Sequence, residues 1–390
     1  MEVLEGSRAV AEVVKRCRPH VISAYPITPQ THIVENLAQM VADGELASEF
    51  VNVESEHSAA SVCLGAAATG ARTYTATSSQ GLALMSEVLY NIAGLRLPVV
   101  LTCANRTLSA PLSIWNDHQD SLMVRDAGVI QLFAEDCQEA ADMHIQAYKL
   151  AEDHRVLLPV MVAMDGFILT HTFEPVTIPT QEEVDAFLPP YQPLHYLTPK
   201  APLSMGTWCE PDKFLEVKYM MHQAMEVALT LIPQIAEDFR RHFGRYSGGL
   251  IEEYRMDDAQ TAFVAMGSLV TTIKDTVDEL REEGHRVGLV KIRAYRPFPT
   301  QAVARALEGV ERVAVIEKAI SIGGVGILAA DIKSALYGRE RPMVGTFIAG
   351  LGGRDVTKDS LRWIMERLEE GATLQEFVDL NLSLIGDDEG

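Results

Sequence analysis

Four short motifs carry side chains that could bind a small charged organic molecule and act on it. They are YPITP (residues 25–29), ESEH (54–57), TSSQG (77–81) and ANRTLS (104–109). An arginine such as Arg106 can bind a carboxylate through two parallel hydrogen bonds. Burial raises the pKa of a carboxyl group in general, so a buried glutamate can hold a proton or share one with a base, and Glu56 is the candidate for this role. The motifs therefore suggest a site that combines anion binding with acid–base chemistry.

The first motif predicts a stiff loop. Pro26 and Pro29 flank Ile27 and Thr28, and proline fixes its own φ while it pushes the preceding residue toward extended geometry. Such a loop has few conformations to lose when a ligand binds. The Thr28 hydroxyl could then donate one well-placed hydrogen bond.

Each motif also has a simpler interpretation. Glu56 at the start of a helix would be stabilised by the helix dipole, without any ligand. Arg106 could form a surface salt bridge, and YPITP could be the ordinary end of a strand. Asp117 and His118 resemble metal ligands, but no second histidine stands at ligand spacing, so we predict no metal site here.

The elements that would position these motifs alternate along residues 19–165. Apolar, β-branched runs predict strands, and helical stretches lie between most of them. Strands that are apolar along their whole length indicate a parallel sheet covered on both faces. The predicted strands are HVISAY (20–25), FVNVE (50–54), TYTAT (73–77), PVVLTCA (98–104), VIQLF (129–133) and LLPVMVAM (157–164).

The four motifs follow the first four predicted strands in order. In an open parallel sheet, ligands bind beyond the carboxyl ends of the strands. Chain order alone therefore places Thr28, Glu56, Ser79 and Arg106 on one edge of the sheet, which we call the rim.

We predict an α/β fold in four parts. Residues 1–174 form the parallel-sheet domain. Eight of the 18 prolines fall between Pro175 and Pro211, which predicts an extended connector over 175–211 with neither helix nor central strand. Apolar spacings of three and four predict a long helix over 212–243 within a segment 212–258, with Gly244 as its stop. A second, smaller α/β domain spans 259–390, with strands AFVAMGS, RVGLVKI, RVAVIE and MVGTFIAG.

Composition restricts the partners. The net charge of −21 disfavours nucleic acids and anionic membranes, which require a basic face. Five scattered cysteines without C-x-x-C spacing offer no iron–sulfur or structural zinc site and suit a reducing cytoplasm. The glycines of SIGGVG (321–326) and AGLGGRD (349–355) match no phosphate-loop motif, so we expect a turn or packing role.

Taken together, the motifs show a family resemblance. YPITPQT, VESEHSAAS, TATSSQGLALM, ANRTLSAPLSIWNDHQD, MDGFILTH and FLPPYQP resemble the α subunit of the multi-subunit 2-oxoacid:ferredoxin oxidoreductases, most closely the pyruvate:ferredoxin oxidoreductases. The resemblance covers nearly the whole chain and is strongest over residues 20–215. It implies a thiamine-diphosphate pyrimidine-binding domain at 1–174 and a transketolase C-terminal-like domain at 259–390.

The resemblance also implies a reaction and partners. Such an enzyme decarboxylates a 2-oxoacid oxidatively, forms an acyl-CoA from coenzyme A and reduces ferredoxin, and the reaction also runs in reverse. A β subunit binds the diphosphate and its Mg²⁺, and it shares the thiamine diphosphate with the α subunit. Further γ- and δ-type subunits complete the complex, and the [4Fe–4S] clusters lie on partner subunits.

The resemblance assigns roles to individual residues. Glu56 faces N1′ of the aminopyrimidine and supports removal of the thiazolium C2 proton, and Arg106 and Thr28 bind the substrate carboxylate. The remaining candidates are Pro26, Ile27, Ser79 and Gln80 for the cofactor, and Asn105 and Asp117 for the substrate.

Several alternatives remain. The same pattern occurs in enzymes for 2-oxoisovalerate and for aryl 2-oxoacids such as phenylglyoxylate, whereas Thr28 argues against oxalate. A different class would be a non-catalytic scaffolding subunit. A nucleotide-binding dehydrogenase is disfavoured because the first turn lacks a glycine-rich motif.

Overall fold

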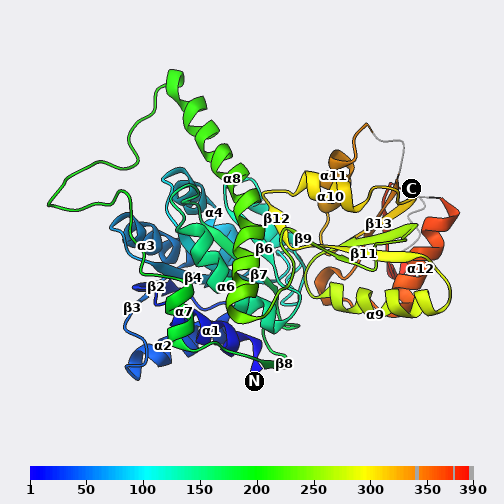
Figure 1. The fold of residues 1–390 in the computed structure, drawn as a ribbon, viewed down its shortest axis with the longest axis horizontal. Coiled ribbons are helices and arrows are strands. Elements are labelled where there is room, and N and C mark those ends of the chain that lie inside the picture. The colour runs from blue at the N-terminus through cyan, green and yellow to red at the C-terminus, as the bar shows by residue number, and fades with distance from the viewer. Residues whose placement is uncertain (339–341, 372–373, 386–390) are drawn as a thin grey trace. The chain divides into compact units, whose positions relative to one another are not determined.

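A computed structural model describes residues 1–338, 342–371 and 374–385 of this chain, so the last residues of the predicted 259–390 domain lie outside the described part (Figure 1). The chain divides into two units. The first contains Met1–Glu252, Met266–Ser268 and Ile292–Pro299, and the second contains Glu253–Ala265, Leu269–Lys291 and Thr300–Gly390. Among the described residues, no helix combines the length and the apolar character that a membrane span requires.

The first unit is built on a seven-stranded sheet in the order β12-β6-β7-β5-β4-β2-β3. Neighbouring strands run parallel, except that β12 is antiparallel to β6. The predicted α/β fold with a parallel sheet is therefore confirmed. The strands are β2 (Val21–Ala24), β3 (Glu49–Asn52), β4 (Thr73–Thr77), β5 (Val99–Asn105), β6 (Ile130–Phe133), β7 (Val160–Asp165) and β12 (Ala294–Arg296).

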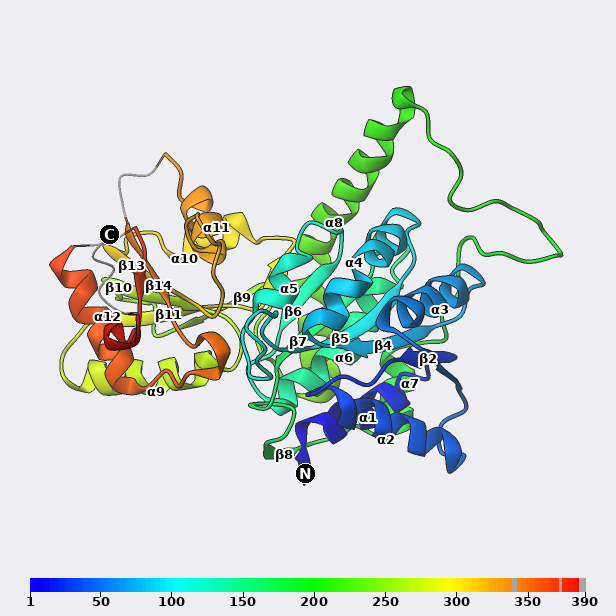
Figure 2. The same ribbon diagram turned by 180° about the vertical axis from the view of Figure 1, so that it is seen from behind.

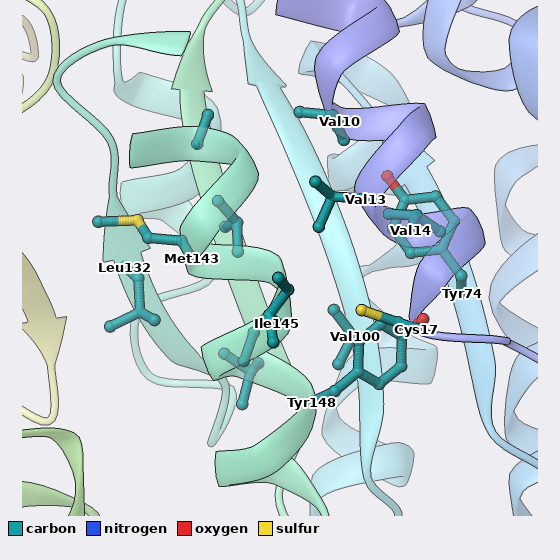
Figure 3. Close-up of a cluster of buried hydrophobic side chains, with 14 of the residues drawn as sticks. Val10, Val13, Val14, Cys17, Tyr74, Val100, Leu132, Met143, Ile145 and Tyr148 are labelled. Carbon is teal, nitrogen blue, oxygen red and sulfur yellow. The ribbon is translucent and has the colours of Figure 1, made fainter. Parts of the chain in front are cut away.

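Two hydrophobic cores cover the two faces of this sheet. Val100 of β5 belongs to the core with α1 (Gly6–Arg16), α2 (Thr31–Ala42) and α6 (Cys137–Ala151). Figure 3 shows Val10, Val13 and Val14 of α1 beside Val100 and the α6 side chains. On either side of Val100 in β5, Val99 and Leu101 belong to the other core, with α3 (Glu56–Ala68) and α4 (Ser79–Gly94). Successive residues point to opposite faces of a strand, so an unbroken apolar run is what a sheet covered on both sides requires.

The proline-rich connector contains one helix that the sequence analysis did not expect. Helix α7 (Gln181–Phe187) occupies the stretch between Pro179 and Pro189, which contains no proline. Its start is stabilised by a capping box, because Thr180 accepts from the Glu183 backbone and Glu183 accepts in return. The prediction of an extended connector is therefore wrong for residues 181–187, whereas residues 189–210 contain no helix or strand.

The long helix α8 (Pro211–Phe243) begins with proline and ends where Gly244 adopts a left-handed φ of 74°. A side chain is disfavoured at such a position, which explains the glycine stop. Figure 2 shows α8 following the extended connector. Two further elements of the first unit are the short α5 (Gln119–Met123) and an antiparallel pair, β1 (Glu2–Glu5) with β8 (Phe173–Val176).

The second unit has its own sheet in the order β15-β14-β13-β10-β11-β9. Its core packs α9 (Leu269–Glu282) and α12 (Lys358–Glu370) against the strands, and α10 (Thr300–Ala306) and α11 (Ile327–Ala335) complete its helices among the described residues. The strands are β9 (Ile251–Tyr254), β10 (Thr261–Ala265), β11 (Val287–Ile292), β13 (Arg312–Glu317), β14 (Met343–Ile348) and β15 (Glu376–Phe377). The four predicted strands of the smaller domain correspond to β10, β11, β13 and β14.

Candidate active site

The loops that follow β2, β4 and β5 meet at the carboxyl edge of the first sheet. Arg106 Nη1 donates a hydrogen bond of 2.8 Å to the Thr28 carbonyl, and Ser79 Oγ donates to the Thr107 carbonyl. The Glu56 side chain approaches the first turn of α4, where a Cβ added to Gly81 would lie 2.8 Å from Glu56 Oε1. The structure thus brings the four motifs of the rim together.

Glu56 is buried but has no hydrogen-bond partner. It is the first residue of α3, which is capped by the Ser55 side chain, and only 8% of its surface is exposed. Within the part of the chain that the structure describes, no group donates a hydrogen bond to its carboxylate. The carboxylate of this largely buried residue is therefore available to a donor on a ligand.

Arg106 keeps one end of its guanidinium available. Nε donates to the Ser113 carbonyl at 3.2 Å and Nη1 donates to Thr28, whereas Nη2 has no hydrogen bond within the described residues. The residue is 8% exposed, and its burial lowers the pKa of the guanidinium from its ordinary value. The side chain is thus fixed in orientation and retains donors for an anion.

Thr28 lies on a loop that the rest of the rim holds in place. Gln30 Nε2 donates to the Tyr25 carbonyl at 3.1 Å and to the Ala76 carbonyl at 2.8 Å. Buried Pro29 packs so closely on Gly166 that a Cβ there would lie 2.5 Å from the proline ring. Thr28 itself is exposed, and its hydroxyl has no partner among the described residues.

The neighbouring candidates Pro26 and Ile27 are exposed and partly buried, respectively. Both lie on the same loop as Thr28, before the anchoring contacts of Gln30 and Pro29. Their side of the loop is therefore accessible to a ligand or to a partner subunit.

A buried aspartate that the sequence analysis missed organises the rim. Asp120 is fully buried in α5, and burial raises the pKa of its carboxyl group. Its carboxylate accepts hydrogen bonds from the backbone N–H groups of Ser79 (2.9 Å) and Arg106 (3.0 Å) and from Asn105 Nδ2 (2.8 Å). One carboxylate thus links the start of α4 to the end of β5. No spacing distinguished Asp120 from Asp117, the other acid of the same segment.

Ser79 supports the rim in a strained backbone conformation. Its φ is +49°, which is uncommon for a residue with a side chain, and it is fully buried. Its hydroxyl also contacts Gln80 Oε1 at 2.5 Å. Gln80 is partly buried. The Ser79 side chain is therefore already engaged by the protein, whereas the Gln80 amide nitrogen has no partner in the described residues.

The two further substrate candidates lie deeper than the rim surface. Asn105 is fully buried, and its Nδ2 also donates to Ser121 Oγ at 2.7 Å. Asp117 is 6% exposed and accepts from the Gln119 backbone at 3.0 Å. Neighbouring His118 forms a buried pair with Asp165 at 2.6 Å. These contacts suit residues that fix the 107–118 loop.

Comparison with known proteins identifies two sequence families along the chain. Residues 12–237 match the family described as pyruvate flavodoxin/ferredoxin oxidoreductase, thiamine diP-bdg. Residues 259–361 match the pyruvate:ferredoxin oxidoreductase core domain II.

Several relatives are similar over almost their full length. The chain is 49% identical to pyruvate synthase subunit PorA of Methanosarcina barkeri over 99% of this chain and 98% of that protein. It is 52% identical to PorA of Pyrococcus horikoshii, covering 95% of each chain. Identity to ketoisovalerate oxidoreductase subunit VorA of Pyrococcus abyssi is 43%, over 95% of this chain and 93% of that one.

A solved structure shares the fold. It is a 2-oxoglutarate:ferredoxin oxidoreductase from Magnetococcus marinus, with a TM-score of 0.69 and 20% identity. The match covers 95% of this chain but 65% of that chain, so this chain spans slightly less than two thirds of its length.

Proposed function

The chain belongs to the pyruvate:ferredoxin oxidoreductase family, and we propose that it is the α subunit of a CoA-acylating pyruvate:ferredoxin oxidoreductase. The complete enzyme decarboxylates pyruvate, transfers the acetyl group to coenzyme A and passes the electrons to ferredoxin, and the reaction is reversible. The observation that carries this proposal is the Glu56 carboxylate, which lies on the same rim as Arg106, is 8% exposed and has no hydrogen-bond partner among the described residues.

The rim fits the aminopyrimidine part of thiamine diphosphate. A carboxylate without an internal donor among the described residues matches a ring nitrogen that carries or receives a proton, and the absence of a side chain at Gly81 lets the Glu56 carboxylate lie against α4. When bound, thiamine diphosphate supplies the electron sink for decarboxylation. Pro26, Ile27 and Gln80 lie where they could line the remainder of the ring site.

Glu56 would hold a proton at the N1′ end of the ring. Because the carboxylate sits at the start of α3 and against the backbone of α4, two helices fix its position. A positioned carboxylate of this kind acts as an acid–base group without any reorganisation during the reaction.

Arg106 and Thr28 would bind the substrate carboxylate. Arg106 Nη2 is available to donate to one oxygen of the substrate carboxylate, and the exposed Thr28 hydroxyl can donate to the carboxylate from the adjacent loop. Fixing the carboxylate orients the ketone carbon for attack, which converts binding energy into rate. The position of Arg106 and Thr28 would be supported by the more deeply buried residues Asn105, Asp117 and Ser79.

The proposed site is completed by partners. Thr28 and Pro26 are exposed, as expected of a surface that another subunit covers. Four of the five cysteines are buried singly and Cys209 is partly buried, so we assign the [4Fe–4S] clusters to partner subunits and the diphosphate with its Mg²⁺ to a β subunit. Further γ- and δ-type subunits, ferredoxin as acceptor and a cytoplasmic location complete the proposal.

The test is a substrate panel on the assembled complex, with coenzyme A and a viologen dye as electron acceptor. We expect kcat/KM for pyruvate to exceed that for 2-oxoisovalerate, 2-oxoglutarate and phenylglyoxylate by at least about tenfold. One extra hydrocarbon group in a fitted pocket can change kcat/KM by this factor. A preference for 2-oxoisovalerate would instead make the chain a ketoisovalerate oxidoreductase subunit, like its VorA relative. Dye reduction with none of these acids would favour a scaffolding subunit.

A further inference from the structure

Three metal-ligating side chains that the proposed reaction does not use gather around the start of α2, directly after the YPITP loop. Glu5, His32 and His171 each offer a ligand atom, and these three atoms all lie within 4.8 Å of one another. His32 Nδ1 lies 2.7 Å from Glu5 Oε1. The three residues come from different parts of the chain: the end of β1, the first turn of α2 and the segment between β7 and β8.

We propose that Glu5, His32 and His171 form a binding site for one divalent transition-metal ion of the zinc class. Two imidazoles and one carboxylate are ligands that zinc and its neighbours accept, and three protein ligands leave a position for water. The site is independent of the proposed reaction and of its cofactor.

The spacing of the ligands suits one ion after a small movement. Two ligand atoms that each lie about 2.1 Å from one ion are roughly 3.0–3.4 Å apart. The His32–Glu5 pair, at 2.7 Å, already has nearly this separation. The third ligand must move inward by roughly 1–1.5 Å to reach the same spacing. The Glu5 side chain is 17% exposed and that of His32 is 45% exposed, so an ion can enter from solvent.

The backbone next to Glu5 packs closely against the segment that carries His171. Gly6 N donates to the Thr172 carbonyl at 3.1 Å, and Ser7 N donates to the Thr170 carbonyl at 3.1 Å. A Cβ at Gly6 would lie 1.9 Å from the Leu169 carbonyl oxygen, so no side chain fits between the two segments. These contacts hold Glu5 beside the segment that carries His171.

The His171 ring is oriented by groups around it. Thr170 Oγ1 lies 2.7 Å from His171 Nδ1, and the ring packs against His32 and Phe167 with centroid separations of 4.7 and 4.9 Å. If Nδ1 donates to Thr170, Nε2 retains a lone pair for a metal, which is the usual arrangement for a ligating histidine.

An ion at this site would connect the β1–β8 pair to the start of α2. Helix α2 begins at Thr31, three residues after Thr28. Metal binding would therefore stabilise the anchored end of the YPITP loop without contacting it.

The test measures zinc binding by the full-length chain in equilibrium dialysis, with bound zinc determined by mass spectrometry. A Cys209→Ser background removes the one cysteine that is not buried. We expect one bound ion per chain, and at least tenfold weaker binding in His171→Gln, His32→Gln and Glu5→Gln, since each variant removes one ligand. Visible absorption of bound Co²⁺ should disappear in the same three variants.

His222→Gln is the matched control. His222 on α8 is exposed and lies 3.8 Å from Glu226, and this histidine–carboxylate pair belongs to no three-ligand group among the described residues. Zinc binding should be unchanged in this variant. Circular dichroism checks the fold of each variant. If a histidine variant unfolds, zinc binding by Glu5→Gln still tests the site, because this substitution changes the side chain least. The same Kd in wild type and in every folded ligand variant would overturn the proposal, as would an equal loss in His222→Gln.

Discussion

Two buried glutamates, one in each unit, occupy similar settings but meet different partners. Glu56 begins α3 in the first unit, and Glu317 ends β13 in the second. Each lies against a glycine, because an added Cβ would be 2.8 Å from Glu56 Oε1 at Gly81 and 1.9 Å from Glu317 Oε1 at Gly326. Glu317 accepts backbone hydrogen bonds at the start of α11, from Leu328 at 2.9 Å and Ala329 at 3.3 Å, whereas Glu56 accepts none within the described residues.

The difference separates an acid that the fold itself satisfies from one that has no hydrogen-bond donor among the described residues. The backbone of α11 satisfies Glu317, so this carboxylate serves the fold. The glycine run before α11 ends at Gly326, in the packing role predicted for SIGGVG. Glu56 is 8% exposed, against 1% for Glu317, and has no internal donor among the described residues, so its carboxylate remains available to a ligand. Four variants test this comparison, in order of their expected effect on activity.

Glu56→Gln should have the largest effect. We expect turnover of the assembled enzyme to fall by more than about a hundredfold, because the amide cannot hold or release a proton. The amide leaves the fold intact, so the melting temperature should change little. Glu54→Gln is the control in the same motif, since Glu54 bonds only to Ser58 among the described residues and should retain activity. An active Glu56→Gln enzyme would make Glu56 structural, like Glu317.

Asp120→Asn should have the second-largest effect on activity, because Asp120 holds the backbones of Ser79 and Arg106 in position. The amide NH2 group would face two donors in either orientation: the backbone N–H groups of Ser79 and Arg106, or Asn105 Nδ2 and the Ser121 backbone N–H. The lost hydrogen bonds should cost about 2 kcal/mol, equivalent to about thirtyfold in kcat/KM. Steady-state kinetics and chemical denaturation measure both effects. Stability that falls while kcat/KM stays within twofold would show that Asp120 serves the fold alone.

Arg106→Lys should raise the KM for the 2-oxoacid by about tenfold with a smaller change in kcat. A lysine provides one point charge where the guanidinium has a fork of donors. Arg125→Lys, at a partly exposed arginine in the same domain, is the matched control. An unchanged KM in Arg106→Lys would remove Arg106 from the substrate site.

Glu317→Gln should change turnover by less than twofold but alter how stability depends on pH. Burial raises the pKa of Glu317 from 4.5 to about 7, so between these values the folded state binds a proton that the unfolded state lacks. The second unit should therefore lose about 3 kcal/mol of stability as pH rises from about 4.5 to about 7. Denaturation of the full-length chain at pH 5 and pH 8 should show this loss in wild type and a smaller one in Glu317→Gln. Equal losses would contradict the assignment.

The fold and the rim could be predicted because the same sequence pattern, an apolar strand followed by a polar motif and a helix, recurs along the first domain. Apolar runs alternated with helices, and the motifs followed consecutive strands, so Thr28, Glu56, Ser79 and Arg106 could be placed on one edge before any coordinates. The site's support could not be predicted, because the carboxylate of Asp120 acts through contacts between distant segments. Strand β12 was missed for a related reason: residues 294–296 join the first sheet although the chain has already entered the second unit.

The most direct test of the Glu56 assignment is hydrogen–deuterium exchange at C2 of thiamine diphosphate bound to the assembled enzyme, in wild type and in Glu56→Gln. The free carboxylate on the rim predicts exchange more than a hundredfold slower in the variant, with cofactor affinity changed by less than about tenfold. Exchange within a few-fold of wild type at full cofactor occupancy would contradict the assignment of Glu56 to the cofactor ring.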